Sequence, residues 1–328
     1  MNRDFAIGCL CIALSTSIFS TMEVFLKLPA VGAFDPMQLT LERAFVGGLL
    51  LIPVARYFLK KHSVELTKRD YGYFAFSGFL TVVLFMALFQ LAVTFGQANV
   101  VAVVFSGNPI FVTVLAALIL HETIRWNNIL ALVFDLLGIL IIVNPFGSSD
   151  LNPVSLAMAL LAALFFSLYS VLSKRKTAKM SSIVVTCFSF LFGSAELLVI
   201  LLLGYTAPGA ALYQKLGMDI LCDVPFLQGF SLETTPYFLF ICIVYCAAGY
   251  VFHMMAIEKT SATYGSLVFF FKPILAPLVA LVVLGEPITP TIAAGIAMFL
   301  VGSLLSIIPN IIRLRKEKQA LLSRRTTI

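Results

Sequence analysis

Long apolar runs separated by short polar segments dominate the sequence. The hydrocarbon core of a bilayer requires about 20 predominantly apolar residues per helix, and a helix satisfies its own backbone hydrogen bonds within that core. Runs of this length recur along the chain, with turn residues such as Gly285-Glu286-Pro287 between them. The pattern predicts an all-α integral membrane protein with ten transmembrane helices, near residues 5–26, 36–57, 71–93, 98–120, 126–143, 154–173, 182–204, 236–257, 262–284 and 291–308.

An internal repeat relates the two halves of the sequence. Residues 104–124 read VFSGNPIFVTVLAALILHETI and residues 268–288 read VFFFKPILAPLVALVVLGEPI, and the shared positions keep a constant offset of 164 residues. Because each half contains an odd number of predicted spans, the second half must enter the bilayer from the opposite face. The chain is therefore predicted to form two inverted five-helix repeats, residues 1–147 and 148–310. Inverted repeats are typical of secondary transporters, in which they form a central site that opens to one side at a time.

Composition and charge agree with a membrane protein and exclude a soluble one. Hydrophobic residues make up 60% of the chain and charged residues 12%, and the mean hydropathy is +1.02. If the N-terminus is cytoplasmic, most of the 22 Lys and Arg residues fall on the cytoplasmic side, which explains the net charge of +6 without a nucleic-acid partner. We therefore expect a cell-membrane protein surrounded by lipid bilayer, with both termini cytoplasmic, a basic tail at 311–328 and an outer loop at 205–235.

Sequence features of disulfide scaffolds and enzymes are weak. Five of the six cysteines fall in apolar runs and only Cys222 lies in a polar loop, so no disulfide framework is expected. The segment His121-Glu122-Thr-Ile-Arg125 begins like a zinc-protease motif, but Arg occupies the position of the second His. With only three histidines in the chain, we predict no metal, no cofactor and no enzymatic activity. A receptor and a membrane enzyme stay open as alternatives.

Several motifs resemble one family, the EamA-type branch of the drug/metabolite transporter (DMT) superfamily, over almost the whole chain. The motifs are Phe19-Ser-Thr-Met-Glu-Val-Phe-Leu-Lys27, Pro36 with Arg43, the helices with Pro109 and Pro273, and Leu284-Gly-Glu286 followed by Gly295 and Gly302. Three residues depart from the family pattern: Phe19 replaces a Trp, His121 a Gly and Ala131 a Gly. The resemblance implies a ten-helix bundle with a central cavity lined by helices that include the fourth and ninth.

The same resemblance implies a secondary transporter that moves a small metabolite by alternating access. Family substrates range from amino acids to drugs, nucleotide sugars and phosphorylated sugars. For this chain we expect a small-molecule solute such as an amino acid, an organic anion or an amphipathic drug-like compound. We expect either a monomer or a homodimer.

Lys272 lies near the middle of a predicted span, where a charge costs several kcal/mol unless it is paired or faces water. Its repeat equivalent is Asn108, and both precede a proline that frees a backbone carbonyl. We predict that the two side chains form the floor of a substrate site. The alternative is a purely structural ion pair between Lys272 and Asp135 or Glu196.

Asp135 and Glu196 are the carboxylates predicted near mid-depth in the fifth and seventh spans. A pair between Lys272 and either of them would release or take up a proton as the cavity alternates, which offers a route to proton coupling. Uncoupled facilitators and exchangers with the same fold stay open as alternatives.

Two further charges, Glu23 and Arg43, fall toward the outer ends of the first two spans. Arg43 cannot be neutralised and needs a carboxylate or carbonyl partner. A Glu23–Arg43 pair is predicted, either as an outer gate or as a structural clamp.

Aromatic and small polar residues near these depths extend the predicted substrate site. Tyr245 and Tyr264 carry hydroxyl groups that need partners when buried, and the face of Phe269 can stack on an amphipathic solute or a cation. Ser106, two residues before Asn108, is the last predicted substrate-binding residue.

Overall fold

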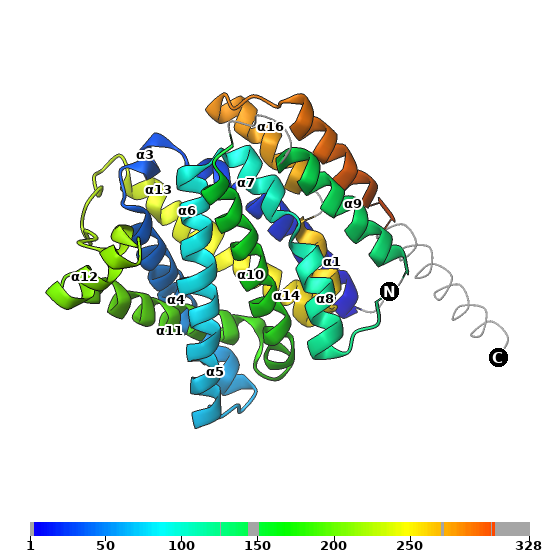
Figure 1. The fold of residues 1–328 in the computed structure, drawn as a ribbon. Coiled ribbons are helices and arrows are strands. Elements are labelled where there is room, and N and C mark those ends of the chain that lie inside the picture. The colour runs from blue at the N-terminus through cyan, green and yellow to red at the C-terminus, as the bar shows by residue number, and fades with distance from the viewer. Residues whose placement is uncertain (1–2, 125, 144–150, 270–271, 303, 306–328) are drawn as a thin grey trace.

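The computed structural model describes residues 3–124, 126–143, 151–269, 272–302 and 304–305, and every regular element in these ranges is helical (Figure 1). In the first half the elements are α1 (Arg3–Phe19), α2 (Met22–Leu26), α3 (Pro29–Gly32), α4 (Pro36–Lys61), α5 (Lys68–Gly78), the π-helix η1 (Phe79–Met86), α6 (Ala87–Phe95), α7 (Ala98–Phe105), α8 (Asn108–Leu120) and α9 (Trp126–Val143). In the second half they are α10 (Pro153–Met180), α11 (Ser182–Gly204), α12 (Ala207–Lys215), the 3-10 helix η2 (Asp219–Leu221), α13 (Thr235–Phe240), the π-helix η3 (Ile241–Gly249), α14 (Tyr250–Lys259), α15 (Ala262–Gly265), the 3-10 helix η4 (Ser266–Phe269), α16 (Lys272–Leu284) and a last helix at Pro290–Gly302.

These elements combine into the predicted spans. Eight stretches built from these helices are long and apolar enough to cross a membrane: Asp4–Leu26, Pro36–Lys61, Lys68–Phe95, Ala98–Leu120, Pro153–Met180, Ser182–Gly204, Thr235–Lys259 and Ala262–Leu284. Two shorter apolar helices, Trp126–Ile142 and Pro290–Gly302, lie where the fifth and tenth spans are predicted. The prediction of an all-α integral membrane protein is confirmed.

The helix ends differ from the predicted ones where polar residues continue a helix beyond the apolar run. The third span begins at Lys68 rather than at residue 71, because Thr67 and Asp70 form a capping box around its first turn. The sixth span extends to Met180 rather than to residue 173. Hydrophobicity locates the membrane core of a helix, whereas capping groups decide where its backbone hydrogen bonds begin and end.

The third span of each half contains a π-helical segment at a corresponding place. In the first half this segment is η1 and in the second it is η3. A π-helix changes the hydrogen-bonding step of the backbone and is often found at functional sites. Arg43 of α4 lies against the first of them, since its Nη2 donates to the carbonyl of Met86 at 3.5 Å.

The predicted outer loop 205–235 contains helices of its own. It carries α12 and η2 and packs over the end of the bundle that holds α3 and α13 (Figure 1). Gln38 Nε2 donates to the Gln228 carbonyl at 3.0 Å, and the rings of Phe34 and Phe230 lie 5.0 Å apart. The segment is therefore an ordered cover rather than a bare connection.

Some predicted features fall outside the described residues. They are the boundary between the two halves at 147/148, Arg125 of the protease-like segment, the end of the tenth span and the tail 311–328.

Candidate functional site

A buried ion pair lies at the centre of the bundle. Lys272, the first residue of α16, contacts Glu23 of α2 through Nζ and Oε1. Lys272 is 1% exposed and Glu23 is fully buried. Two charges withdrawn from water cost several kcal/mol each, and their attraction offsets that cost only with close contact and further favourable partners.

Aromatic rings supply those further contacts to the ammonium group. Lys272 Nζ lies 4.7 Å from the ring centroid of Phe105, 5.5 Å from that of Phe89 and 5.7 Å from that of Phe269. A cation over an aromatic face gains about 0.5–2 kcal/mol, more when it is desolvated. The central charge is thus stabilised from one direction by a carboxylate and from the others by rings.

The space beside this pair is small. A cavity of about 10 Å³, called here the central cavity, has room for about one water molecule. Its lining residues are Phe19, Met22, Phe85, Phe89, Phe105, Phe166, Tyr250, Phe269 and Lys272. The central cavity that the family resemblance implies is therefore nearly closed here.

Three spans are irregular near the pair. The first span breaks between α1 and α2, directly before Glu23, and the ninth begins as α15 followed by the 3-10 helix η4, which precedes Lys272. The fourth breaks between α7 and α8, at Ser106 and Gly107. Interrupted helices in transporters bring free backbone groups to a central site.

Two of the predicted binding residues lie close to the ion pair. Phe269 is part of the ring set around Lys272. Tyr245 is buried, and its hydroxyl hydrogen-bonds that of Thr21 at 2.8 Å, two residues before Glu23. Tyr264 does not line the central cavity.

Asn108 contacts α10 rather than Lys272. Its Nδ2 donates to the Ala163 carbonyl at 3.1 Å and to Ser167 Oγ at 2.6 Å, both on α10, and it does not line the central cavity. Ser106 is buried and donates to the Ala102 carbonyl of its own helix at 2.6 Å. The shared floor of Lys272 and Asn108 is not observed, because α8 packs on α10 from its first residue.

The predicted partners of the charged residues also differ. Glu23 pairs with Lys272 rather than with Arg43, and Arg43 is fully buried with Nε and Nη1 lacking hydrogen-bond partners among the described residues. Neither Asp135 nor Glu196 is the carboxylate that contacts Lys272. Glu196 is half-buried on α11, and Asp135 is fully buried on α9.

A second internal repeat could have pointed to Glu23. Residues 19–27 read FSTMEVFLK and residues 166–174 read FSLYSVLSK, so the first and sixth spans share a motif. Asn108 contacts Ser167 in one copy of this motif, and its equivalent Lys272 contacts Glu23 in the other copy. Aligning the two copies would have predicted that the motif in the first span faces Lys272.

Glu122 and Glu286 close the two ends of the bundle in a reciprocal manner. Glu286 accepts hydrogen bonds from the backbone N–H groups of Ala98 and Asn99, at 2.9 Å each, at the start of the fourth span. Glu122 accepts from the backbone N–H of Ala262 at 3.3 Å and from Thr263 Oγ1 at 2.7 Å, at the start of the ninth span.

Neither contact is made to the helix that directly follows the glutamate in the sequence. Each glutamate caps a helix of the other repeat, where free N–H groups and the helix dipole favour a carboxylate. We call these two contacts the Glu286 latch and the Glu122 latch.

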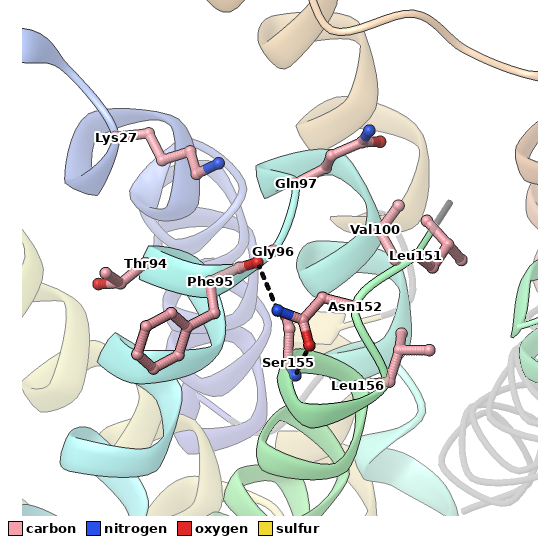
Figure 2. Close-up of a pocket in the computed structure, with 10 residues that line it drawn as sticks. All are labelled: Lys27, Thr94, Phe95, Gly96, Gln97, Val100, Leu151, Asn152, Ser155 and Leu156. Carbon is pink, nitrogen blue, oxygen red and sulfur yellow. Dashed lines mark hydrogen bonds between the residues drawn. The ribbon is translucent and has the colours of Figure 1, made fainter. Parts of the chain in front are cut away.

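A cavity adjoins each latch. The first end cavity measures about 220 Å³ and is lined by Lys27, Thr94, Phe95, Gly96, Gln97, Val100, Leu151, Asn152, Ser155 and Leu156 (Figure 2). Asn152 Nδ2 donates to the Phe95 carbonyl across it at 3.3 Å, and Lys27 Nζ lies 3.8 Å from Glu286 Oε1.

The second end cavity measures about 480 Å³ and lies at the other end of the fourth span. It is lined by His121, Glu122, Thr123, Asn128, Lys174, Thr260, Ser261, Thr263, Tyr264 and Leu267. Lys174, the motif equivalent of Lys27, donates to the Glu258 carbonyl at 3.2 Å and the Thr260 carbonyl at 2.7 Å. The predicted residue Tyr264 therefore belongs to this end cavity.

Metal ligands do not cluster in the part of the chain that the structure describes, where no group of three or more His, Cys, Asp or Glu side chains could hold an ion.

Comparisons with known proteins agree on one family. The sequence profile of the EamA-like transporter family matches residues 6–144 and 154–308. A protein of Clostridium kluyveri named "Uncharacterized transporter" is 33% identical over 311 residues, which cover 92% of this chain and 94% of that protein. YvbV of Bacillus subtilis, named as an uncharacterized transporter, is 21% identical over 273 residues and covers 83% of each chain. A crystal structure with 16% sequence identity matches with a TM-score of 0.64 over 92% of this chain and 96% of its own, and it supports the fold alone.

Proposed function

Because the chain belongs to the EamA-like transporter family of the DMT superfamily and is a multi-pass membrane transporter, we propose that it carries a small metabolite across the cell membrane by alternating access. The solute is an amino acid, an organic anion or an amphipathic compound with an acidic group. Both termini face the cytoplasm in this proposal, and the two repeats, residues 1–147 and 148–310, are the parts that move.

The buried Lys272–Glu23 pair is the observation that carries this proposal. A carboxylate or phosphate on the solute would replace Glu23 beside the ammonium, so the charge of Lys272 would stay compensated during binding. A zwitterionic solute would in addition offer its own ammonium to Glu23. The rings of Phe105 and Phe269 would then contact the apolar part of the solute.

Two latches at opposite ends support alternating access. Each latch joins the fourth span, in the first repeat, to the ninth span, in the second repeat. The Glu286 latch lies at one end of these spans and the Glu122 latch at the other, so releasing one latch would separate the repeats at one end only. The small central cavity and the two larger end cavities correspond to a conformation closed at both ends. A solute would enter the centre from an end cavity after the adjoining latch has opened.

Five other predicted residues have places in this scheme. We assign Tyr245 to the wall next to Glu23 and Tyr264 to the path through the second end cavity. Asn108 and Ser106 hold the interrupted fourth helix next to the site, and Arg43 joins α4 to the π-helical segment η1.

Solute counterflow into proteoliposomes tests the proposal. Purified protein is first screened by thermal stabilisation against amino acids, organic acids and amphipathic cations, and the stabilising compound is then used for counterflow. We expect K272Q and E23Q to reduce counterflow by at least about tenfold, equivalent to ~1.4 kcal/mol of lost interaction. K215Q, a change at an exposed lysine of α12, is the matched control. Wild-type flux in a folded K272Q variant would refute the proposed site.

An uncoupled exchanger is the second candidate, and the same ion pair favours it. Because Lys272 and Glu23 compensate each other, the empty centre carries no net charge from this pair, and its closed form needs no ion to return. Flux that requires solute on both sides and is insensitive to a collapsed proton gradient would identify this mode.

A further inference from the structure

Asp135 is a buried carboxyl group without a partner. It lies on α9 and is fully buried, and neither of its side-chain oxygens has a hydrogen-bond partner among the described residues. An isolated ionised carboxylate in such surroundings costs far more than a neutral one, so a group of this kind takes up a proton instead. The mechanism proposed above does not use this residue.

A small cavity adjoins this carboxyl group. Its volume is about 10 Å³, and its other lining residues are Pro109, Thr113, Asn128, Ala131, Leu132, Thr263, Ser266 and Leu267. These residues come from α8, α9, α15 and η4 and carry no charge. From the last helix, Gly302 faces the carboxyl group so closely that an added Cβ would lie 2.6 Å from Asp135 Oδ1. Each packed element thus presents hydroxyl, amide or apolar groups, and the described lining has no cation to balance an ionised Asp135.

The repeat equivalent of Asp135 is apolar. At the offset of 164 residues stands Phe299, which is 1% exposed. Its ring faces Gly138, where an added Cβ would lie 2.9 Å from Phe299 Cδ2, just as Asp135 faces Gly302. The two halves therefore share the helix crossing but not the carboxyl group, which is confined to the first half.

The cavity beside this carboxyl group adjoins the second end cavity. The two cavities share Asn128, Thr263 and Leu267. Thr263 also donates to Glu122 at 2.7 Å, so it belongs to the Glu122 latch. Opening this latch would release Thr263 from Glu122 and connect the two cavities.

We propose that Asp135 is a proton-binding site that exchanges its proton with the second end cavity when the Glu122 latch opens. A hydronium ion in the end cavity delivers the proton and becomes a water molecule, an O–H bond forms on the carboxylate, and the closed conformation retains the neutral carboxyl group. The pH on that side of the membrane then sets how readily the protein closes. This link to transport rests on the alternating access proposed above, whereas proton binding itself does not.

Infrared spectroscopy of the purified full-length protein tests the proton directly. A protonated carboxyl group has a C=O stretching band that an ionised carboxylate lacks, and the band shifts in D₂O. We expect the difference spectrum between wild type and D135N to contain this band near neutral pH. E65Q, a change at an exposed loop carboxylate, is the control and should leave the band in place. Equal bands in wild type and a folded D135N protein would overturn the proposal.

The exchange route has its own matched test. We expect E122Q to speed the hydrogen–deuterium shift of the Asp135 band several-fold, and E286Q, at the repeat-equivalent latch, to leave its rate unchanged. Equal acceleration by both variants would overturn the one-sided route.

Two further outcomes distinguish a bound proton from a bound metal cation, and the proton site from solute transport. Loss of the wild-type band when sodium replaces choline would show a metal cation in place of the proton and overturn the proposal. A protein with the Asp135 band but no solute flux would refute the proposed function and leave the proton site intact. Solute flux in a protein that lacks the Asp135 band would overturn the proton site and leave the proposed function intact.

Discussion

At the scale of single residues, Lys272 and Glu23 are two charged side chains that form an ion pair inside the bundle. Both side chains are almost completely buried, so neither can return to water when the other is removed. Removing one partner of such a pair typically costs about 3–5 kcal/mol, whereas replacing both often costs little. The intact pair therefore adds little to the stability of the fold, but each charge requires the presence of the other.

A double-mutant cycle measures this asymmetry. We expect K272Q and E23Q each to lower the free energy of unfolding by about 3–5 kcal/mol, because each leaves a buried charge without its partner. The double variant K272Q/E23Q should recover part of that loss, since two amides replace two charges. Thermal unfolding of the purified proteins gives the values, and fully additive losses would show that the two side chains are not coupled.

At the scale of elements, the two latches depend on helix N-termini more than on particular side chains. The fourth and ninth spans each begin with N–H groups that a glutamate of the other repeat satisfies. The sequence locates both glutamates through the repeat. It does not predict which helix start each of them meets, because contacts between repeats depend on how the two halves pack.

Hydrogen–deuterium exchange can resolve each latch separately. We expect E286Q to speed exchange at the amides of Ala98 and Asn99, and E122Q to speed it at Ala262, each with little effect at the opposite end. An N-terminal cap is worth about 0.5–2 kcal/mol, so opening should become several-fold more frequent in each variant. The two substitutions serve as controls for each other. Unchanged exchange at both helix starts would show that the capping contacts do not limit opening.

Features that depend on the local sequence could be predicted, whereas contacts between helices far apart in the sequence could not. Hydropathy and the 164-residue repeat predict the spans and the burial of Lys272, because both follow from properties along the chain. The contacts of Lys272 with Glu23 and of Asn108 with Ser167 were not predicted, since they depend on the rotation of one packed helix against another. The first two spans likewise place Glu23 and Arg43 at similar depth, yet similar depth does not imply contact.

At the scale of the whole molecule, the loop 205–235 is a cover at one end of the bundle, the end toward which α3 and α13 lie (Figure 1). The positive-inside pattern predicts that this end faces the outside of the cell. Cys222 lies in this cover between Asp219 and Asp223, and its thiol reports both its position and its surroundings.

Maleimide labelling of intact cells tests the orientation. Desolvation, followed by the neighbouring carboxylates of Asp219 and Asp223, raises the pKa of the Cys222 thiol above its usual value. Because the thiolate is the reactive form, a membrane-impermeant maleimide should label Cys222 from outside slowly near neutral pH and faster as the pH rises toward that raised pKa. D219N/D223N should lower the pKa and speed labelling at a fixed pH.

The controls for this labelling separate orientation from reactivity. C222S should abolish the outside signal, because the other cysteines lie in the predicted apolar runs. In that background, E65C, on the loop between α4 and α5, should react only after the membrane is permeabilised, since the odd number of spans between residues 65 and 222 places them on opposite faces. Labelling of E65C in intact cells together with protection of Cys222 would reverse the orientation. In that case the Glu122 latch, and with it the proton exchange proposed for Asp135, would face the outside of the cell.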